Sequence, residues 1–311
     1  MTGCPPDGER AIRPAGPVDL RLTLAPLCRG RGDPCMRIGP DGVWRATRTP
    51  EGPVTTRLTA AVGVGGHGEL TMRAWGPGTG WALEAFPALV GAADEAAGWA
   101  PTDPVVHDLH RRMPGVRIPR SGAVVEALVP SILEQKVVGV EARRSYARLV
   151  RVLGEPAPGP ATARLMVPPA PRTLAATPSY VFHRFGVERK RADTIRLACS
   201  YAARLEEALA MPPAAAGRRL TALPGIGRWT AAEVGRVALG DTDAVSVGDY
   251  HLPNQVAWAL AGEARADDAR MLELLEPYRG HRARVIRLIE TGSGAAPRFG
   301  PRMALRSIAS M

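Results

Sequence analysis

Residues 220 to 260 carry the pattern that decides the fold: LTALPGIGRWTAAEVGRVALGDTDAVSVGDYHLPNQVAWAL. The pattern predicts a short helix, a tight turn over LPGIG and a second helix that opens at Arg228 or Trp229. Gly225 and Gly227 have no Cβ atoms, so backbone N–H groups can converge on an anion at the start of that second helix. The turn fits a phosphate-binding corner, and it fits an ordinary corner between two helices as well.

Asp249 stands in SVGDYHLP, where the next helix is predicted to begin, with Pro253 in its first turn. A carboxylate at this place points toward the floor of a cleft rather than along the flank of a helix. Aspartate is also a favoured N-cap residue, and Ser246 and Asp249 have the spacing of a capping box. From the residues alone, a functional carboxylate and an ordinary helix cap are both open.

The same segment resembles the signature of the helix-hairpin-helix DNA glycosylases, which reads L-P-G-[IV]-G-x-x-T-A and is followed by a second helix and an Asp. Four further stretches agree, namely DPVVHDLHRRMPGVRIPRSG, VVEALVPSILEQKVVGVEARRSYARLV, FGVERKRADTIRLACSYA and LEPYRGHRARVIRLI. The likeness covers roughly residues 18 to 290 and is greatest to the bacterial inducible (type II) 3-methyladenine DNA glycosylase family. The positions that match the signature are Leu223, Pro224, Gly225, Ile226, Gly227, Thr230, Ala231 and Asp249.

The resemblance implies a monofunctional glycosylase, which hydrolyses the N-glycosidic bond of a damaged base, an alkylated purine, as the first step of base excision repair. Asp249 would be its essential carboxylate, which stabilises the oxocarbenium character that develops at the sugar. Trp229 occupies the position where bifunctional relatives carry a Schiff-base lysine, so we expect hydrolysis without strand nicking. The alternative for Trp229 is a large core residue.

The resemblance also implies a base pocket made by four residues. Trp229 walls this pocket in the nearest relatives, and Tyr250 would add a second aromatic face. Glu233 and Arg287 stand where the alkyl-purine enzymes carry further aromatic walls, and aromatic faces attract cationic bases. Their loss weakens the case for 3-methyladenine, although Glu233 could attract a cationic base or accept a hydrogen bond from an exocyclic amine. A solvated helix face is the alternative for Glu233.

A further set of residues is expected to contact DNA. In relatives the hairpin grips the backbone and its carbonyl oxygens hold a monovalent cation, which the resemblance allows here. Gln135 matches the loop that fills the gap left by a flipped base, and Lys136 stands where the nearest relative has an apolar wedge. The basic cluster beside Gly186 fits a phosphate contact or a solvated face. The predicted DNA-contacting residues are Leu223, Gly225, Ile226, Gly227, Arg228, Thr230, Gln135, Lys136, Arg189 and Lys190.

The composition agrees with a nucleic-acid partner. The chain of 311 residues has a formal net charge of +10, and only Lys136 and Lys190 are lysines. Guanidinium groups, which fork well onto phosphate, therefore carry nearly all the positive charge. A coding bias toward arginine would give the same composition. Double-stranded DNA is the predicted partner, and neither a membrane nor an obligate protein partner is expected.

The cysteines argue against a metal site, because Cys4, Cys28, Cys35 and Cys199 form no C-x-x-C pair. No cysteine follows Glu290, so the iron–sulfur cluster of other branches of the family is not expected, and we predict no cofactor. No stretch approaches the roughly 20 apolar residues of a membrane span. We expect a soluble, cytoplasmic monomer with reduced thiols.

The expected fold class is α+β: an antiparallel β lobe followed by a two-lobed helical domain. Residues 1 to 17 are rich in Pro, Gly and charge and predict a flexible tail. Residues 18 to 100 hold the strand-like runs VDLRLTLAPL, GVWRATRT, VTTRLTAAVGV and ELTMRAWG, and then a covering helix in FPALVGAADEAAGW. Residues 101 to 290 are helical in pattern around a Pro-rich linker at 155 to 173, and 291 to 311 form a C-terminal tail.

Two other functions fit these residues. A non-catalytic DNA-binding protein could keep the hairpin, although it would have no need for Asp249. A glycosylase for deaminated or oxidised bases would share the hairpin and the carboxylate and differ only in its pocket. A panel of damaged bases would separate these classes.

Overall fold

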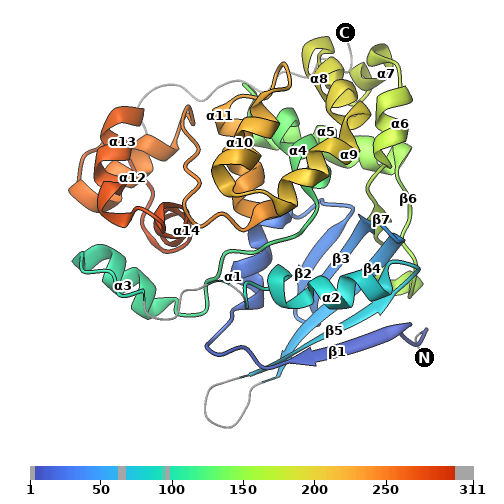
Figure 1. Ribbon diagram of the computed structural model, residues 1–311, viewed down its shortest axis with the longest axis horizontal. Helices are drawn as coiled ribbons and strands as arrows, with labels where there is room; N and C mark the ends of the chain where they lie inside the picture. Colours follow the sequence, from blue (N-terminus) through green and yellow to red (C-terminus); the bar gives the residue numbers. More distant parts are fainter. Residues whose placement is uncertain (1–3, 62–67, 93, 95–98, 298–311) are drawn as a thin grey trace.

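The computed structural model describes residues 4–61, 68–92, 94 and 99–297, and it confirms the predicted α+β class. A five-stranded antiparallel sheet lies at one side of the molecule, and most of the helices lie on the other (Figure 1). The strand order is β1-β5-β4-β3-β2. The strands are β1 (Gly8–Ile12), β2 (Met36–Gly39), β3 (Gly42–Thr49), β4 (Gly52–Ala61) and β5 (Glu69–Trp75).

Both faces of the sheet are buried. Side chains on neighbouring positions of a strand point to opposite sides, so each strand contributes to two separate cores. One face packs Val43, Leu58 and Met72 against two helices, α1 (Leu20–Leu24) and α2 (Thr79–Leu89). The other face carries Trp44 and Trp75, whose rings stack with their centroids 5.5 Å apart. This second face is covered by Ala157, Ala163, Leu165 and Val167, in the segment that follows α5 (Gly139–Leu153).

Two predictions for the N-terminal part are wrong. Residues 8–12, expected in a flexible tail, form the edge strand β1, which backbone pairing with β5 holds in place. The run VDLRLTLAPL, expected as a strand, forms α1 and the short helix η1 (Ala25–Leu27). Asp19 starts α1 by accepting a hydrogen bond from the Leu22 N–H, and Leu20 and Leu24 bury one helical face.

Two other predicted segments are only partly described. The covering helix predicted at 86 to 99 ends at Leu89 in the structure, and residues 93 and 95–98 lie outside the described residues. The predicted C-terminal tail begins in the last turn of α14, which extends to Gly292, and residues 298–311 lie outside the described residues.

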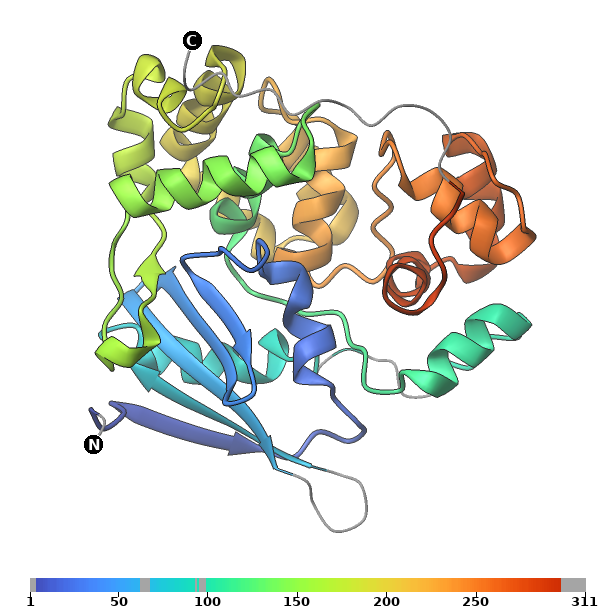
Figure 2. The same ribbon diagram turned by 180° about the vertical axis from the view of Figure 1, so that it is seen from behind.

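The helices of the remaining chain surround two separate cores. The first is built on α4 and α8, and the second joins α3 to the last three helices, so two helical groups lie side by side (Figures 1 and 2). The elements are α3 (Pro104–Arg112), α4 (Val124–Leu133), α5 (Gly139–Leu153), α6 (Pro171–Ala176), α7 (Ser179–His183), α8 (Arg189–Ser200), α9 (Ala202–Glu206), η3 (Glu207–Ala210), α10 (Pro213–Thr221), α11 (Arg228–Val234), η4 (Gly235–Leu239), α12 (Leu252–Ala261), α13 (Asp268–Leu275), η5 (Glu276–Tyr278) and α14 (Arg282–Gly292).

The segment predicted as an extended linker at 155 to 173 is a small hairpin. It consists of β6 (Glu155–Pro156), η2 (Ala161–Ala163) and β7 (Met166–Val167). The β6–β7 hairpin covers the second face of the sheet, where the Thr55 hydroxyl donates to the Pro158 carbonyl at 2.6 Å. It therefore fastens the first helical group to the sheet.

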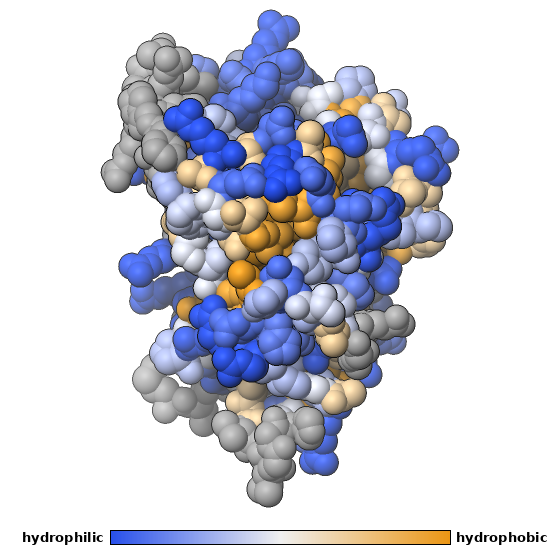
Figure 3. All heavy atoms as spheres, turned by 90° about the vertical axis from the view of Figure 1, so that its left-hand side faces the viewer, coloured by the Kyte–Doolittle hydropathy of each residue, from blue (hydrophilic) through white to orange (hydrophobic). Residues whose placement is uncertain are grey.

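The second helical group forms one end of the molecule. Its helices α3 and α12 each leave one large apolar side chain partly exposed, Val105 and Trp258. Figure 3 views this end and shows hydrophobic residues gathered in a band between hydrophilic ones. Within the part of the chain that the structure describes, no helix has both the length and the apolar character to cross a membrane.

Candidate active site

The predicted hairpin between α10 and α11 is present. Its two glycines differ in whether the structure has room for an added side chain. Gly225 has a φ of +88°, and a Cβ atom there would lie 2.5 Å from the Thr194 hydroxyl of α8. Gly227 has a φ of −94°, and a Cβ atom there would meet nothing within 4 Å. Gly225 is thus required by a close approach to α8, whereas Gly227 leaves the outer side of the turn open.

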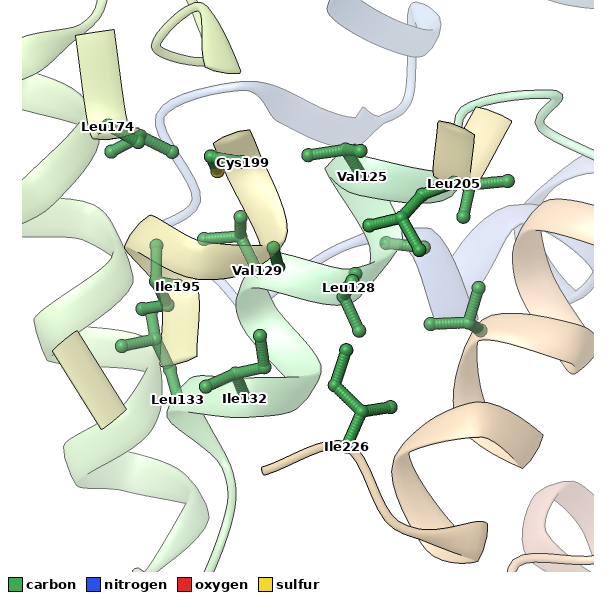
Figure 4. Close-up of a cluster of buried hydrophobic side chains, with 14 of the residues drawn as sticks. Val125, Leu128, Val129, Ile132, Leu133, Leu174, Ile195, Cys199, Leu205 and Ile226 are labelled. Carbon is green, nitrogen blue, oxygen red and sulfur yellow. The ribbon is translucent and has the colours of Figure 1, made fainter. Parts of the chain in front are cut away.

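Ile226, predicted to contact DNA, points inward instead. Its side chain is 4% exposed and is directed toward Leu128 of α4 in the first helical core (Figure 4). Leu223 packs against the same core. These two side chains anchor the hairpin, and at the buried Ile226 only the backbone can contact a ligand.

Gln135 and Thr230 also hold the hairpin. The Gln135 amide donates to the Gly225 carbonyl and to the Thr230 hydroxyl, both at 2.9 Å. In the structure Gln135 therefore joins the end of α4 to the hairpin, rather than projecting freely as the predicted gap-filling residue would. Lys136, the next residue, is exposed at the tip of the turn with a φ of +55°, which is uncommon for a residue other than glycine.

The predicted cations lie around this edge of the molecule. Arg228, Arg189 and Lys190 are exposed, and Arg189 forms only a surface ion pair, 3.6 Å from Asp193. Such a pair contributes little to stability, so the guanidinium is available to a ligand. We call the turn after α4, the start of α8 and the hairpin together the hairpin edge.

Asp249 lies in the segment that crosses from the first helical core to the second. Its Oδ1 accepts the backbone N–H groups of His251 and Leu252 at 2.8 and 2.9 Å, so it holds the first residue of α12, although the N-cap position itself is His251. Its Oδ2 accepts the indole N–H of Trp229 at 2.9 Å. The carboxylate, which is partly exposed, is thus fixed by both helices that flank the crossing segment.

Trp229 and Tyr250 differ from each other in placement. Trp229 is partly buried and uses its indole N–H on Asp249, so it is more than a core residue. Tyr250, predicted as a second pocket wall, is 81% exposed, and its ring stands edge-on to His251 with centroids 4.9 Å apart. Tyr250 therefore does not share a cavity with Glu233 and Arg287, and its side chain lies in solvent.

Glu233 and Arg287, the other two predicted pocket residues, line one cavity of about 190 Å³. Glu233 therefore does not lie on a solvated helix face. Its carboxylate pairs with Arg236 and accepts the Ser246 hydroxyl, so the capping box predicted for Ser246 is not formed. Three further charged residues line the cavity and were missed by the sequence analysis: Arg29, Arg236 and Glu290.

The local helix geometry explains part of this lining. After α11 the chain continues as one π-helical turn, η4, which places Arg236 between Glu233 and Glu290. Such turns are rare and often occur at functional sites. Glu134, at the end of α4, is close by: burial raises the pKa of its carboxyl, and the negative charges of Glu233 and Asp249 raise it further.

The fold is similar to that of solved DNA glycosylases. A 3-methyladenine DNA glycosylase from Archaeoglobus fulgidus superposes with a TM-score of 0.76 at 18% sequence identity, over 90% of this chain and 97% of that one. An 8-oxoguanine glycosylase/lyase from Clostridium acetobutylicum superposes with a TM-score of 0.67 at 10% identity, over 93% and 98%. The chain has the fold of a DNA glycosylase.

The same Clostridium enzyme bound to duplex DNA superposes with a TM-score of 0.65 at 10% identity, over 91% of this chain and 96% of that one. No model of a known protein family matches the sequence, and no curated protein matches it. The similarity to DNA glycosylases therefore rests on the superposition of structures and not on a sequence match.

Proposed function

We propose that this chain is a monofunctional DNA glycosylase, which binds duplex DNA along the hairpin edge and hydrolyses the N-glycosidic bond of a flipped-out damaged base. The observation that carries the proposal is the bond from Trp229 to Asp249. Trp229 follows the hairpin directly on α11, so a duplex held at the hairpin presents its sugar near the carboxylate. The protein would act as a cytoplasmic monomer without a protein partner or a metal cofactor.

Asp249 would act on the charge that develops as the base leaves. The bond from C1′ to the base nitrogen breaks, water adds to C1′, and the departing base takes a proton. A carboxylate held in place before the reaction stabilises the positive sugar without having to reorient. The two backbone N–H groups and the indole N–H supply that fixed orientation.

The absence of an amine at position 229 predicts hydrolysis without strand nicking, since a lyase needs a Schiff-base nitrogen at the sugar. Duplexes that carry a damaged base should be nicked only after alkali treatment, and base release should precede nicking. The measurement is single-turnover release from a panel of alkylated, deaminated and oxidised bases, with strands resolved before and after alkali. Nicking without alkali would contradict the proposed monofunctional chemistry.

The base itself belongs to one of two classes. The sequence resemblance favours an alkylated purine, and the Archaeoglobus neighbour is named for 3-methyladenine. Neutral oxidised or deaminated bases form the second class, which a specific observation favours: among the described residues, none that lines the cavity beside α11 is aromatic, whereas aromatic faces attract cationic bases. Both classes leave the role of Asp249 unchanged.

The two hairpin glycines provide a test of DNA binding. Gly227→Ala should leave stability unchanged, because the added methyl meets no atom and φ is −94°. The methyl would instead stand between the hairpin backbone and phosphate, so we expect duplex affinity to fall roughly tenfold, the loss of about one hydrogen bond to a charged group. Fluorescence anisotropy with a labelled duplex measures this.

Gly225→Ala is the matched control. Its methyl would approach Thr194 at a φ of +88°, so this variant should lose roughly 1–3 kcal/mol of stability as well as affinity. If Gly227→Ala bound duplex DNA as tightly as the unchanged protein, the hairpin would be an ordinary helix corner.

A further inference from the structure

The helix α5 begins at the hairpin edge and carries a basic face. Its first residue, Gly139, follows the turn after α4, and its 15 residues span about 22 Å. Figure 2 shows α5, in green, lying across the front of the molecule. Four of its residues are arginines, and Glu141 is its only acidic residue. The helix therefore extends the positive charge of the hairpin edge along the surface.

Two of these arginines have no partner. Arg151 donates to the Gly32 carbonyl at 3.2 Å, so it is turned toward the loop before β2. Arg144 and Arg148, one helical turn apart, are exposed. Among the residues that the structure describes, neither forms a hydrogen bond or an ion pair through its side chain. Like charges at this spacing repel each other, so a bound anion would stabilise this part of α5.

A third cation joins them from the neighbouring turn. The Ser145 hydroxyl donates to the Gly186 carbonyl at 3.5 Å, so the middle of α5 lies against the turn before α8. Arg184 is exposed in this turn and also has no partner in the described part of the chain. The turn leads into the start of α8, which belongs to the hairpin edge. We call Arg144, Arg148 and Arg184 the α5 face.

Exposed arginines on other parts of the surface are compensated by carboxylates. Arg13, Arg111 and Arg279 lie far from one another in the sequence, and each has a guanidinium nitrogen within 3.2 Å of a carboxylate oxygen. The α5 face differs, because its three arginines lie together and no carboxylate pairs with them in the described structure. A cluster of uncompensated guanidinium groups fits a polyanionic partner.

We infer, on the basis of the proposed function, that the α5 face binds phosphates of the duplex beyond the hairpin. Guanidinium groups bind phosphate oxygens through paired N–H donors. Phosphates of one strand repeat every 3.4 Å or so along the duplex, so a helix of about 22 Å can run beside roughly six base pairs. The helix and the hairpin belong to the first helical core, whereas Asp249 leads into the second, so the added contacts lie on one side of the damaged base.

The salt dependence of duplex binding tests this contact. Each phosphate contact contributes about 0.9 to the slope of log affinity against log salt concentration, so Arg144→Gln/Arg148→Gln/Arg184→Gln should make the slope shallower by about 2 to 3. Its affinity at low salt should fall roughly 10- to 100-fold. The measurement is fluorescence anisotropy with a labelled duplex that extends to both sides of an abasic-site analogue.

A second triple variant removes the same net charge elsewhere. Arg13→Gln/Arg111→Gln/Arg279→Gln replaces three exposed, ion-paired arginines outside the hairpin edge and should leave the slope unchanged. Circular dichroism checks that both variants are folded. Equal changes in the two variants would overturn the inference, because the loss would then follow the net charge of the protein rather than a contact at α5.

Duplexes shortened on one side locate the contact. Two duplexes are compared, each ending close to the abasic-site analogue on a different side. The unchanged protein should lose affinity for one of the two, and Arg144→Gln/Arg148→Gln/Arg184→Gln should be insensitive to that same shortening. Equal losses on both sides, or a variant that remains as sensitive as the unchanged protein, would overturn the inference.

Base release separates this inference from the proposed function. Since the α5 face lies away from Asp249, the variant should need a higher protein concentration for half-maximal release, by the same factor as its loss of affinity. An unchanged salt slope in a variant protein that still releases the base would overturn the α5 contact alone. No release from any damaged duplex by unchanged, folded protein would overturn the proposed function and leave the binding result standing.

Discussion

Asp249→Asn is expected to lower the rate of base release by about 10²- to 10³-fold, the usual loss when one fixed electrostatic group is removed from an active site. Asparagine is nearly isosteric and can still accept the backbone N–H groups of His251 and Leu252 through Oδ1. It has no negative charge to stabilise the sugar. The rate of the chemical step should therefore fall. Duplex affinity, measured on an abasic-site analogue, should stay within a factor of about two.

Asp267→Asn is the matched control for this prediction. Asp267 is the N-cap of α13, where its Oδ1 accepts from the Arg270 N–H at 2.9 Å. If Asp249 served only to hold the start of α12 through its backbone bonds, the two substitutions would have equal and small effects on both stability and base release. We expect Asp267→Asn to leave the release rate unchanged, and a normal rate in Asp249→Asn would favour a DNA-binding protein without turnover.

The local features of the site could be predicted from the sequence because short-range geometry determines them. Gly225 specifies the turn through its positive φ, and Pro253 marks the helix after Asp249. The bond from Trp229 to Asp249 joins two residues whose functional roles only the family resemblance implied. These residues share one supersecondary unit, so their spacing along the chain fixes their relation in space.

The features that were missed depend on long-range packing. Arg29 reaches the cavity from the N-terminal part, and no local pattern connects it to Glu233 or Arg287. The run at Leu20 to Leu24 alternates like a strand, but its i and i+4 leucines also fit a helix, and contact with the sheet decides between the two. Residues 8–12 bury little side-chain area, and they are held mainly by backbone pairing with β5, together with the bond from Arg10 to the Leu83 carbonyl and the packing of Ile12 against the core.

Arg284→Met is expected to lower the free energy of unfolding by about 3–5 kcal/mol, because it leaves a buried carboxylate without its partner. Arg284 and Asp94 are only 2% and 3% exposed and form two hydrogen bonds with each other. Asp94 also accepts the Ile118 N–H at 3.1 Å, and Ile118 lines the charged cavity. The pair thus connects α14 to the segment of Ile118, and both contribute residues to the lining of the cavity. Urea denaturation measures the change.

An exposed ion pair provides the comparison for this prediction. Arg279 pairs with Glu276 at 2.6 Å with its side chain 70% exposed, so Arg279→Met should cost under about 1 kcal/mol. Adding Asp94→Asn to Arg284→Met removes the stranded charge and keeps an acceptor for Ile118, so the double variant should recover stability relative to Arg284→Met alone. If Arg284→Met cost no more than Arg279→Met, the buried pair would not be what holds α14 against the cavity wall. A large loss that the second substitution partly restores would place the cost on the unpaired Asp94 charge.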